Sequence, residues 1–212
     1  MLRYVTGQDL VKYPKLRATM LRDRAAQFSD RLGWAVAVDD AGFEQDQYDA
    51  LNPLYVIWQR PDGCHGGSMR FLPTTGRCMV NEHFLHLNKG APLYDPAIWE
   101  CTRFCLAPGA GPHVAAALML AGGELLERQG LRHFVGVFDA NMERIYRRIG
   151  ACPDILGHAG EGRDKVRLGL WSLTPEARTR VARRARLSSA LSDLWYRRAF
   201  GDATDAGLAR TA

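Results

Sequence analysis

The chain has no long apolar run and no paired cysteine motif. Over its 212 residues, no segment approaches the roughly 20 consecutive apolar residues that a membrane-spanning helix needs. The amino-terminal stretch "MLRYVTGQDLVKYPK" carries polar residues where a secretory signal has an unbroken apolar centre. The five cysteines form an odd set without CxxC spacing, which argues against a disulfide framework and against a zinc site. We therefore expect a cytoplasmic protein with reduced thiols and no membrane span.

Familiar catalytic signatures are also missing. The sequence contains no GxSxG elbow, no HExxH pair and no calcium-loop pattern, so neither a nucleophilic triad nor a metal site is predicted. The segment "NEHFLH" offers Glu82, His83 and His86, but such a group more often lies on the surface than around zinc. The segment "PGAGP" (108–112) can bind a phosphate through backbone N–H groups or simply form a tight turn, and the sequence leaves both open.

Positive charge is concentrated at the carboxyl-terminal end. The net charge is +5, and residues 163–212 contain 11 Lys and Arg against 5 Asp and Glu. The segment "RTRVARRARLSS" lacks interleaved aromatic residues and any DNA-binding motif, so we expect no nucleic-acid partner. A solvated helical face or a docking surface for an acidic protein is the favoured interpretation.

Local patterns predict an α/β (α+β) fold with a mixed central sheet. With 47% hydrophobic residues, the chain can form one domain over residues 1–200, followed by a frayed tail at 201–212. Apolar spacing predicts one or two amphipathic helices over residues 9–28, and an irregular region is expected over 73–98. The other predicted elements are strands at 54–59, 65–73, 99–107, 131–138 and 165–173, and helices at 112–130, 141–150 and from Pro175 onward.

The order of these elements predicts the directions of the strands. The turn "RPDG" joins strands 54–59 and 65–73 into an antiparallel hairpin. Strands 99–107 and 131–138 flank a helix, so they form a crossover unit and should run parallel. Helices are then expected on both faces of a sheet whose first half is antiparallel.

Charged residues within predicted core strands require partners. Arg70 and Glu100 lie among Met69, Phe71 and Trp99, where an unpaired charge would be costly. The segment "FEQDQYD" (43–49) places three carboxylates within six residues, and these need water, a metal ion or fixed cations around them. A purely structural network of acidic loop and strand arginines explains this set as readily as catalysis does.

The segments "RDRAAQFSDRLGW", "FEQDQYD", "GSMRFLPTTGRCM", "HF" and "IWECTRF" carry a family resemblance. In order and spacing they resemble the acyl-homoserine-lactone synthases of the LuxI type, which make quorum-sensing autoinducers. The match spans roughly residues 20–150. Ten residues stand at the positions of the family signature, namely Arg24, Phe28, Trp34, Glu44, Asp46, Asp49, Arg70, Phe84, Glu100 and Arg103.

The resemblance implies a fold like that of the GNAT acyltransferases and a reaction between S-adenosylmethionine and an acyl-carrier-protein thioester. S-adenosylmethionine is then a substrate, and no cofactor is expected. Glu100, directly or through a water, would deprotonate the substrate amine. Arg24, Arg70 and Arg103 would hold the acidic loop and the substrate carboxylate. Phe28, Trp34 and Phe104 would form the wall of the adenosyl and sulfonium site.

The resemblance also places an acyl pocket between strands 99–107 and 131–138. Its expected lining is Cys101, Leu118, Met119, Gly136, Phe138, Met142 and Ile145. Some relatives carry a hydroxyl residue on the second strand, a feature associated with 3-oxo chains, whereas this chain has Gly136 and Phe138 there. Chain length, oxidation at carbon 3 and oligomeric state stay open.

Two alternatives to a carrier-dependent synthase remain. One is a GNAT-fold N-acyltransferase that uses acyl-coenzyme A, and the other is a non-catalytic family member that binds S-adenosylmethionine or an acyl carrier. The "PGAGP" segment keeps the coenzyme A donor open. The basic carboxyl-terminal region, opposite in charge to acidic carrier proteins, favours the carrier.

Overall fold

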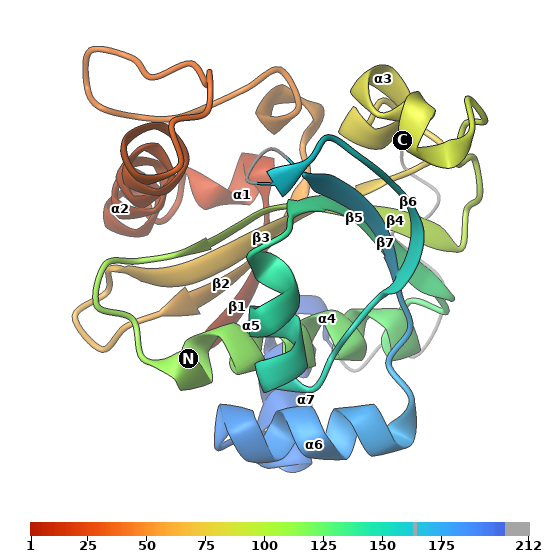
Figure 1. Cartoon of the computed structure of the whole chain (residues 1–212). Helices are drawn as coiled ribbons and strands as arrows, with labels where there is room; N and C mark the ends of the chain where they lie inside the picture. Colours follow the sequence, from red (N-terminus) through yellow and green to blue (C-terminus); the bar gives the residue numbers. More distant parts are fainter. Residues whose placement is uncertain (163–164, 202–212) are drawn as a thin grey trace.

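A seven-stranded mixed sheet organises the chain. The computed structural model describes residues 1–162 and 165–201, and its strands are ordered β1-β2-β3-β4-β5-β7-β6 (Figure 1). The strands are β1 (Leu2–Thr6), β2 (Leu54–Gln59), β3 (His65–Pro73), β4 (Ile98–Leu106), β5 (His133–Asp139), β6 (Asp154–Ala159) and β7 (Val166–Trp171). The predicted frayed tail lies outside the described residues except for Gly201.

The predicted strand directions are confirmed. Strands β1, β2, β3 and β4 pair antiparallel, each with the next in sequence. Strands β4 and β5 pair parallel. Strand β7 then pairs antiparallel with β5 on one side and with β6 on the other. Paired positions between β4 and β5 end at Glu100 and Val135, so this part of the sheet lacks further cross-strand pairing. Strands β1 and β6, which lie at the two edges of the sheet, were not predicted, because short edge strands carry a weak hydrophobic pattern.

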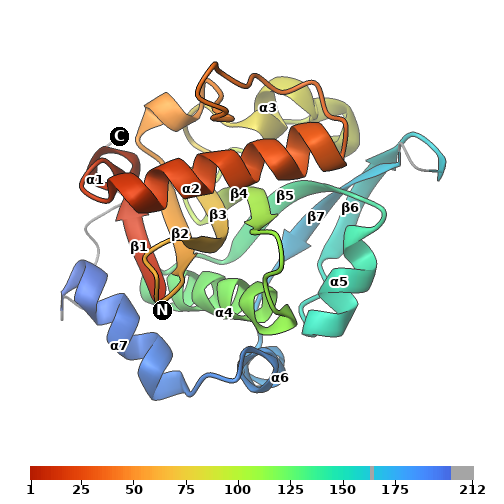
Figure 2. The same ribbon diagram turned by 90° about the vertical axis from the view of Figure 1, so that its left-hand side faces the viewer.

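Helices cover both faces of the sheet, as predicted. Helices α2 and α3 lie on one face, and α4, α6 and α7 lie on the other (Figures 1 and 2). None of the helices within residues 1–162 and 165–201 is long and apolar enough to cross a membrane. Their bounds are α1 (Gly7–Leu10), α2 (Pro14–Ala25), α3 (Met79–His83), α4 (Pro112–Arg128), α5 (Met142–Ile149), α6 (Pro175–Ala185) and α7 (Ser189–Phe200).

The region 9–28, for which one or two helices were expected, contains two. Helix α1 ends at Leu10 and α2 begins at Pro14, because a proline disfavours helical backbone at the residue before it, here Tyr13. A π-helical turn, η1 (Ala26–Arg31), continues α2. Residues 73–98, expected to be irregular, contain α3 and the short 3-10 helix η3 (Leu85–Asn88).

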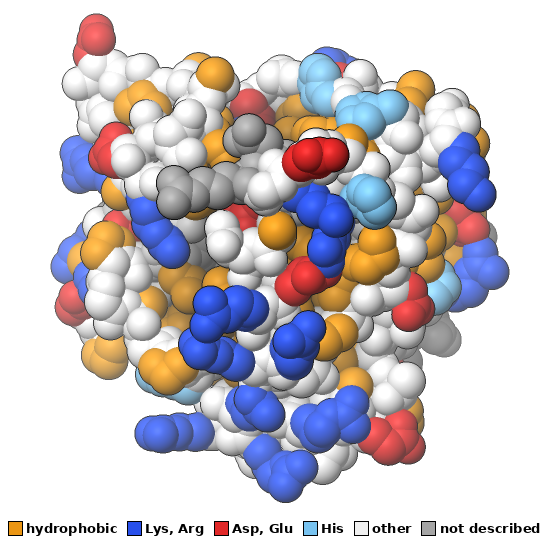
Figure 3. Space-filling model, in the orientation of Figure 1, with side chains coloured by type: hydrophobic (Ala, Val, Ile, Leu, Met, Phe, Trp, Pro, Cys, Tyr) orange, Lys and Arg blue, Asp and Glu red, His pale blue; other side chains and the backbone are white. Residues whose placement is uncertain are grey.

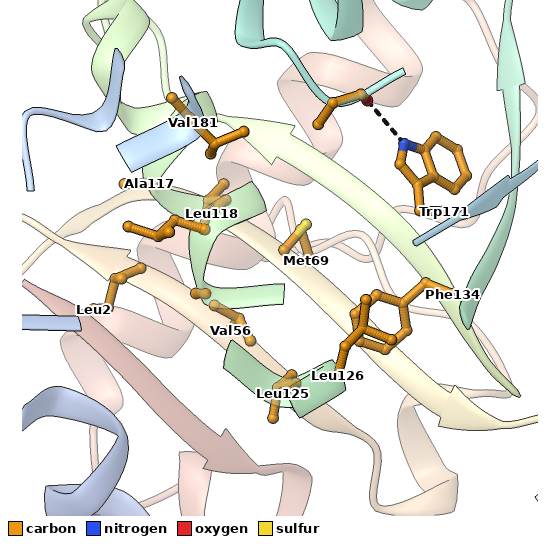
Figure 4. Packing of buried hydrophobic residues seen from close by; sticks show 14 of the residues in the cluster. Leu2, Val56, Met69, Ala117, Leu118, Leu125, Leu126, Phe134, Trp171 and Val181 are labelled. Carbon is orange, nitrogen blue, oxygen red and sulfur yellow. Dashed lines mark hydrogen bonds between the residues drawn. The ribbon is translucent and has the colours of Figure 1, made fainter. Parts of the chain in front are cut away.

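The main hydrophobic core lies between the sheet and α4 (Figure 4). Most of α4 is buried, and Leu118, Leu120 and Leu125 are fully enclosed. Val56 and Met69 meet this helix from the sheet, and the indole of Trp171 donates a 3.1 Å hydrogen bond to the carbonyl of Ala151. In this layer α4 packs on β1, β2 and β3.

Candidate active site

The acidic loop "FEQDQYD" is held by arginines. Arg24 on α2 donates to Glu44 at 2.6 Å and to both oxygens of Asp49 at 2.9 and 3.0 Å. Arg70 on β3 donates to both oxygens of Asp46, at 2.5 and 2.9 Å, and to Asp49 at 2.9 Å. Fixed cations therefore balance the carboxylates that the sequence crowds together.

Burial makes this network rigid and sensitive to any loss of a partner. Arg24, Glu44 and Arg70 are all 0% exposed. Burial alone would raise the pKa of Asp49, but the guanidinium groups of Arg24 and Arg70 hold that pKa well below its usual range. Removing one member of such a buried set leaves an uncompensated charge, at a cost of about 3–5 kcal/mol.

Arg103 connects the network to the interior of the site. Its guanidinium lies 2.9 Å from Glu44 and 2.7 Å from Asp46. Between Ser68 and Arg70 on β3, the paired positions on β4 move from Cys105 to Thr102, so β4 contains an extra residue. Arg103 sits in this bulge with a left-handed backbone (φ 52°), a conformation that is rare for arginine and typical of functional sites.

Glu100 lies on β4, and its buried carboxyl group contacts the first residues of α3. Its side chain accepts hydrogen bonds from the backbone N–H groups of Met79 at 3.0 Å and Val80 at 2.6 Å. Burial raises the pKa of Glu100 to about 7, although these two N–H groups oppose the shift. Near neutral pH the carboxyl is thus divided between its acid and base forms, as a general base requires.

A cavity of about 1150 Å³ runs past Glu100 from one face of the sheet to the other. Its lining includes Asp46 and Arg103 near the acidic loop, and Met119 and Met142 near α4 and α5. The cavity passes beside the part of β4 that no longer pairs with β5. Single small-molecule sites usually measure roughly 300–1,000 Å³, so the volume suits two substrates together.

Two aromatic rings form one end of this cavity. Phe28, on the π-helical turn η1, stacks on Trp34 with ring centroids 5.3 Å apart and an interplanar angle of 16°. The guanidinium of Arg103 lies 5.3 Å from the centroid of the Phe28 ring. Trp34 is 42% exposed, so this end of the cavity combines aromatic faces with access from solvent.

Comparison with known proteins gives one consistent family. The autoinducer synthase family model matches residues 8–181. The chain belongs to the autoinducer synthase family. It is 40% identical to an acyl-homoserine-lactone synthase of Rhizobium etli, over 88% of this chain and 92% of that protein.

Solved structures agree with this assignment. The CoA-dependent acyl-homoserine lactone synthase MesI superposes with a TM-score of 0.77 at 27% identity, covering 90% of this chain and 98% of that one. TofI, solved in a ternary complex with an inhibitor and MTA, superposes with a TM-score of 0.66 at 29% identity, covering 82% and 91%. The protein is thus an acyltransferase of the acyl-homoserine-lactone synthase class with a GNAT-like fold, as the signature residues predicted.

Most residues singled out from the sequence line the synthase cavity. These are Phe28, Trp34, Asp46, Phe84, Glu100, Cys101, Arg103, Phe104, Met119, Gly136, Phe138 and Met142. Arg24, Glu44, Asp49 and Arg70 lie behind them in the ion-pair network and do not line the cavity. Arg70 and Arg24 therefore position the loop, while Arg103 alone among the three predicted arginines lines the cavity.

Two residues predicted for the acyl pocket do not line the cavity. Leu118 is 0% exposed and points toward Gly67 of β3, because its position on α4 faces the sheet while Met119 faces the cavity. Ile145 packs against the main core, and Tyr146 lines the cavity in its place. Met142 and Tyr146 are four residues apart and so share one face of α5, a spacing that was visible in the sequence.

Four further aromatic cavity residues were not predicted as site residues, although two of them, Tyr48 and His83, lie within the segments that carry the family resemblance. Tyr48 and His83 line the side near α3, and Phe134 and Trp171 line the side near α4. An aromatic residue on a strand is usually core, so only the tertiary structure separates a cavity wall from ordinary packing.

Proposed function

We propose that this synthase transfers an acyl group from an acyl-carrier-protein thioester to the α-amine of S-adenosylmethionine, then forms the lactone and releases methylthioadenosine for quorum-sensing signal production. The observation that carries the proposal is the single cavity, which joins an aromatic, charged end to an apolar end with Glu100 between them. The binding of MTA by TofI supports the adenosyl substrate. In this proposal S-adenosylmethionine is consumed as a substrate and no further cofactor takes part.

The stacked pair of Phe28 and Trp34 provides aromatic faces for the sulfonium and the adenosyl group. The Nε and Nη2 atoms of Arg103 donate hydrogen bonds to Glu44. Among the described residues, the Nη1 atom donates only to the sulfur of Met79, at 3.7 Å. A thioether is a weak acceptor, so Nη1 can donate to the substrate carboxylate instead. Phe84 completes the walls of this half of the cavity, whereas Phe104, which was also predicted for it, lies against Tyr146 in the other half.

Glu100 is the general base for the first step. Each carboxylate oxygen already accepts one backbone N–H but keeps a second lone pair, so it can take the amine proton directly or through a water. The amine then forms the amide bond as the thioester C–S bond breaks, and the carrier leaves as a thiolate that takes up a proton to become the free thiol. In the second step the substrate carboxylate attacks its own γ-carbon, and the C–S⁺ bond breaks to release methylthioadenosine. This step depends mainly on positioning, since the sulfonium leaves readily.

The carrier protein is supported by a basic surface beside the acyl half of the cavity. Basic side chains, all of them arginine within these two helices, gather over α5 and α6, which lie side by side (Figure 3). Helix α5 lines the cavity through Met142 and exposes Arg147 and Arg148 on its other side. Arg180 and Arg184 of α6 are exposed next to Gly150, at the end of α5. An acidic carrier docked on this surface would present its thioester near the cavity.

Acyl-coenzyme A is a second candidate donor. Pro108, Gly109 and Ala110 of the "PGAGP" segment, which precedes α4, line a smaller cavity of about 310 Å³ together with Arg31 and Asp23. Backbone N–H groups at such a helix start can bind phosphate. MesI, a structural relative of this chain, is CoA-dependent.

Mass spectrometry of the purified protein with S-adenosylmethionine and matched carrier-protein and coenzyme A thioesters tests the proposal. We expect an acyl-homoserine lactone with stoichiometric methylthioadenosine, and higher kcat/KM with the carrier. Charge reversal at Arg147 and Arg148 should raise KM for the carrier thioester and leave KM for S-adenosylmethionine unchanged. Reversal of Lys15, an exposed residue on α2 and on the opposite face of the sheet, is the matched control. Equal use of both donors, with no effect of the reversal, would favour coenzyme A.

A further inference from the structure

The apolar half of the cavity contains a cluster of four aromatic rings, Phe104, Phe138, Tyr146 and Trp171, which we call the aromatic cage. The centroid of the Tyr146 ring lies 5.1 Å from that of Trp171, 5.2 Å from that of Phe138 and 6.3 Å from that of Phe104. All three contacts are edge to face, with interplanar angles of 73° to 88°, so the position of the Tyr146 ring is defined by packing.

The hydroxyl of Tyr146 is the unusual feature of this cage. Tyr146 is only 5% exposed, yet among the residues that the structure describes its hydroxyl makes no hydrogen bond, and it is not one of the enclosed side-chain atoms that lack a partner, so it faces the cavity. Buried tyrosines normally find a partner within the protein, whereas a hydroxyl at a cavity wall is left to bind water or a ligand. The other tyrosines buried in this fold find such a partner, namely Tyr4 on Ala121, Tyr48 on Glu82, Tyr55 on Asp49 and Tyr196 with Gln129.

Strand β5 cannot supply a hydroxyl side chain at the same place. A Cβ atom on Gly136 would lie 2.7 Å from the backbone oxygen of Cys101, so any larger residue there would force the two strands apart. Phe138, two residues further along, is part of the aromatic cage. The only hydroxyl within the cage therefore comes from α5, through Tyr146.

The ring of Tyr146 lies beside β4 and β5, against Phe104 and Phe138, in the cavity that Glu100 also lines. Burial, and then the proximity of the Cys101 thiol and the Asp139 carboxyl, raise the pKa of Tyr146 well above its usual range, so the phenol stays protonated. Cys101 directly follows the proposed base Glu100 on β4, and both line the cavity. A neutral phenol can donate one hydrogen bond and accept another, which suits either a hydroxyl or a carbonyl oxygen.

We propose that Tyr146 is a specificity-determining residue, and that its hydroxyl hydrogen-bonds an oxygen substituent on the acyl chain close to the thioester. The inference rests on the proposed function for the identity of its donor. This hydrogen bond would make the synthase prefer oxygen-substituted acyl chains over unsubstituted chains of equal length.

The test is Tyr146→Phe, which removes only the hydroxyl and leaves the ring packing in place. Lactone formation is measured with unsubstituted, 3-hydroxy and 3-oxo thioesters of one chain length. Since a neutral hydrogen bond contributes about 0.5–1.5 kcal/mol, kcat/KM for the favoured oxygen-substituted donor should fall roughly three- to tenfold. Turnover of the unsubstituted donor should stay within about twofold. The donor that loses rate shows whether the partner is a hydroxyl or an oxo group.

Tyr94→Phe makes the same chemical change at a side chain that is 71% exposed, and it should alter no donor ratio. If Tyr146→Phe proves unstable in urea, Tyr146→Met fills the space with a flexible apolar chain and repeats the comparison. An unchanged donor ratio, an equal loss for all donors, or a wild-type preference for unsubstituted chains would each overturn the inference.

Calorimetric binding of the substituted and unsubstituted acyl-homoserine lactones gives a readout that does not need turnover. We expect wild type to bind the substituted lactone more tightly, and Tyr146→Phe to abolish that difference. If wild type makes no lactone from any donor, the proposed function fails, and the binding ratio still decides the role of Tyr146.

Discussion

Replacing Glu100 with Gln separates the chemical role of this carboxyl from its structural role. The side chain keeps its size and still accepts a hydrogen bond, but it can no longer take a proton. Loss of a general base typically slows a reaction by about 10²- to 10⁴-fold. We expect a decrease of that size in kcat, measured as methylthioadenosine release with saturating S-adenosylmethionine, while the far-UV spectrum stays unchanged.

The same substitution has a stability effect whose sign follows from the pKa. Burial raises the pKa of Glu100 from its usual 4.5 to about 7, so the folded protein binds this proton more tightly than the unfolded chain does. The resulting stabilisation is fully present below pH 4.5 and is lost as the pH rises through 7. Each pH unit in this window corresponds to about 1.4 kcal/mol, so the total loss is roughly 3 kcal/mol.

The Glu100→Gln variant has no titrating group at this position, so its free energy of unfolding does not fall in this way as the pH rises. Its amide also leaves one of the two backbone N–H groups, on Met79 or Val80, without an acceptor, at a pH-independent cost of about 1–3 kcal/mol. Relative to wild type, the variant should therefore gain up to about 3 kcal/mol between pH 5 and pH 8. Urea unfolding at several pH values measures this change.

Glu124→Gln is the matched control for this experiment. Glu124 is also 0% exposed, but it joins α4 to α6 and α7 through Arg178 and Ser192, and it does not line the cavity. Its substitution should lower stability and preserve kcat. Unaltered turnover in Glu100→Gln would remove Glu100 from its role as base, and a stability difference that is constant with pH would refute the pKa argument.

Two further substitutions test the substrate end and the ion-pair network. Trp34→Ala should raise KM for S-adenosylmethionine by about 2- to 30-fold through loss of a cation–π face, with little change in the urea midpoint and partial rescue by Trp34→Phe. An unchanged KM would place the sulfonium elsewhere. Arg24→Met should lower the free energy of unfolding by about 3–5 kcal/mol, because Glu44 and Asp49 lose their buried partner. A loss below about 1 kcal/mol would show that Arg70 and Arg103 suffice to hold the loop.

Local patterns in the sequence determined much of the fold and the family. The "RPDG" turn specified the antiparallel pair β2 and β3, and the strand, helix and strand from β4 to β5 specified the parallel pair, because turn chemistry and chain crossover act over short distances. The order and spacing of the signature residues was enough to predict the synthase family. The carboxylates near residue 46 and the buried charges at Arg70 and Glu100 were correctly identified as needing partners.

The tertiary structure decided which partner each charge received and which residues face the cavity. Arg103 reaches the acidic loop because a bulge in β4 reverses its backbone, and this bulge depends on the register of β4 against β3. Leu118 and Met119 are neighbours in sequence, yet one packs on the sheet and the other lines the cavity. Tyr146 enters the aromatic cage because α5, β5 and β7 converge there. Such contacts join residues far apart in the chain, and the hydrophobic pattern of a single segment does not encode them.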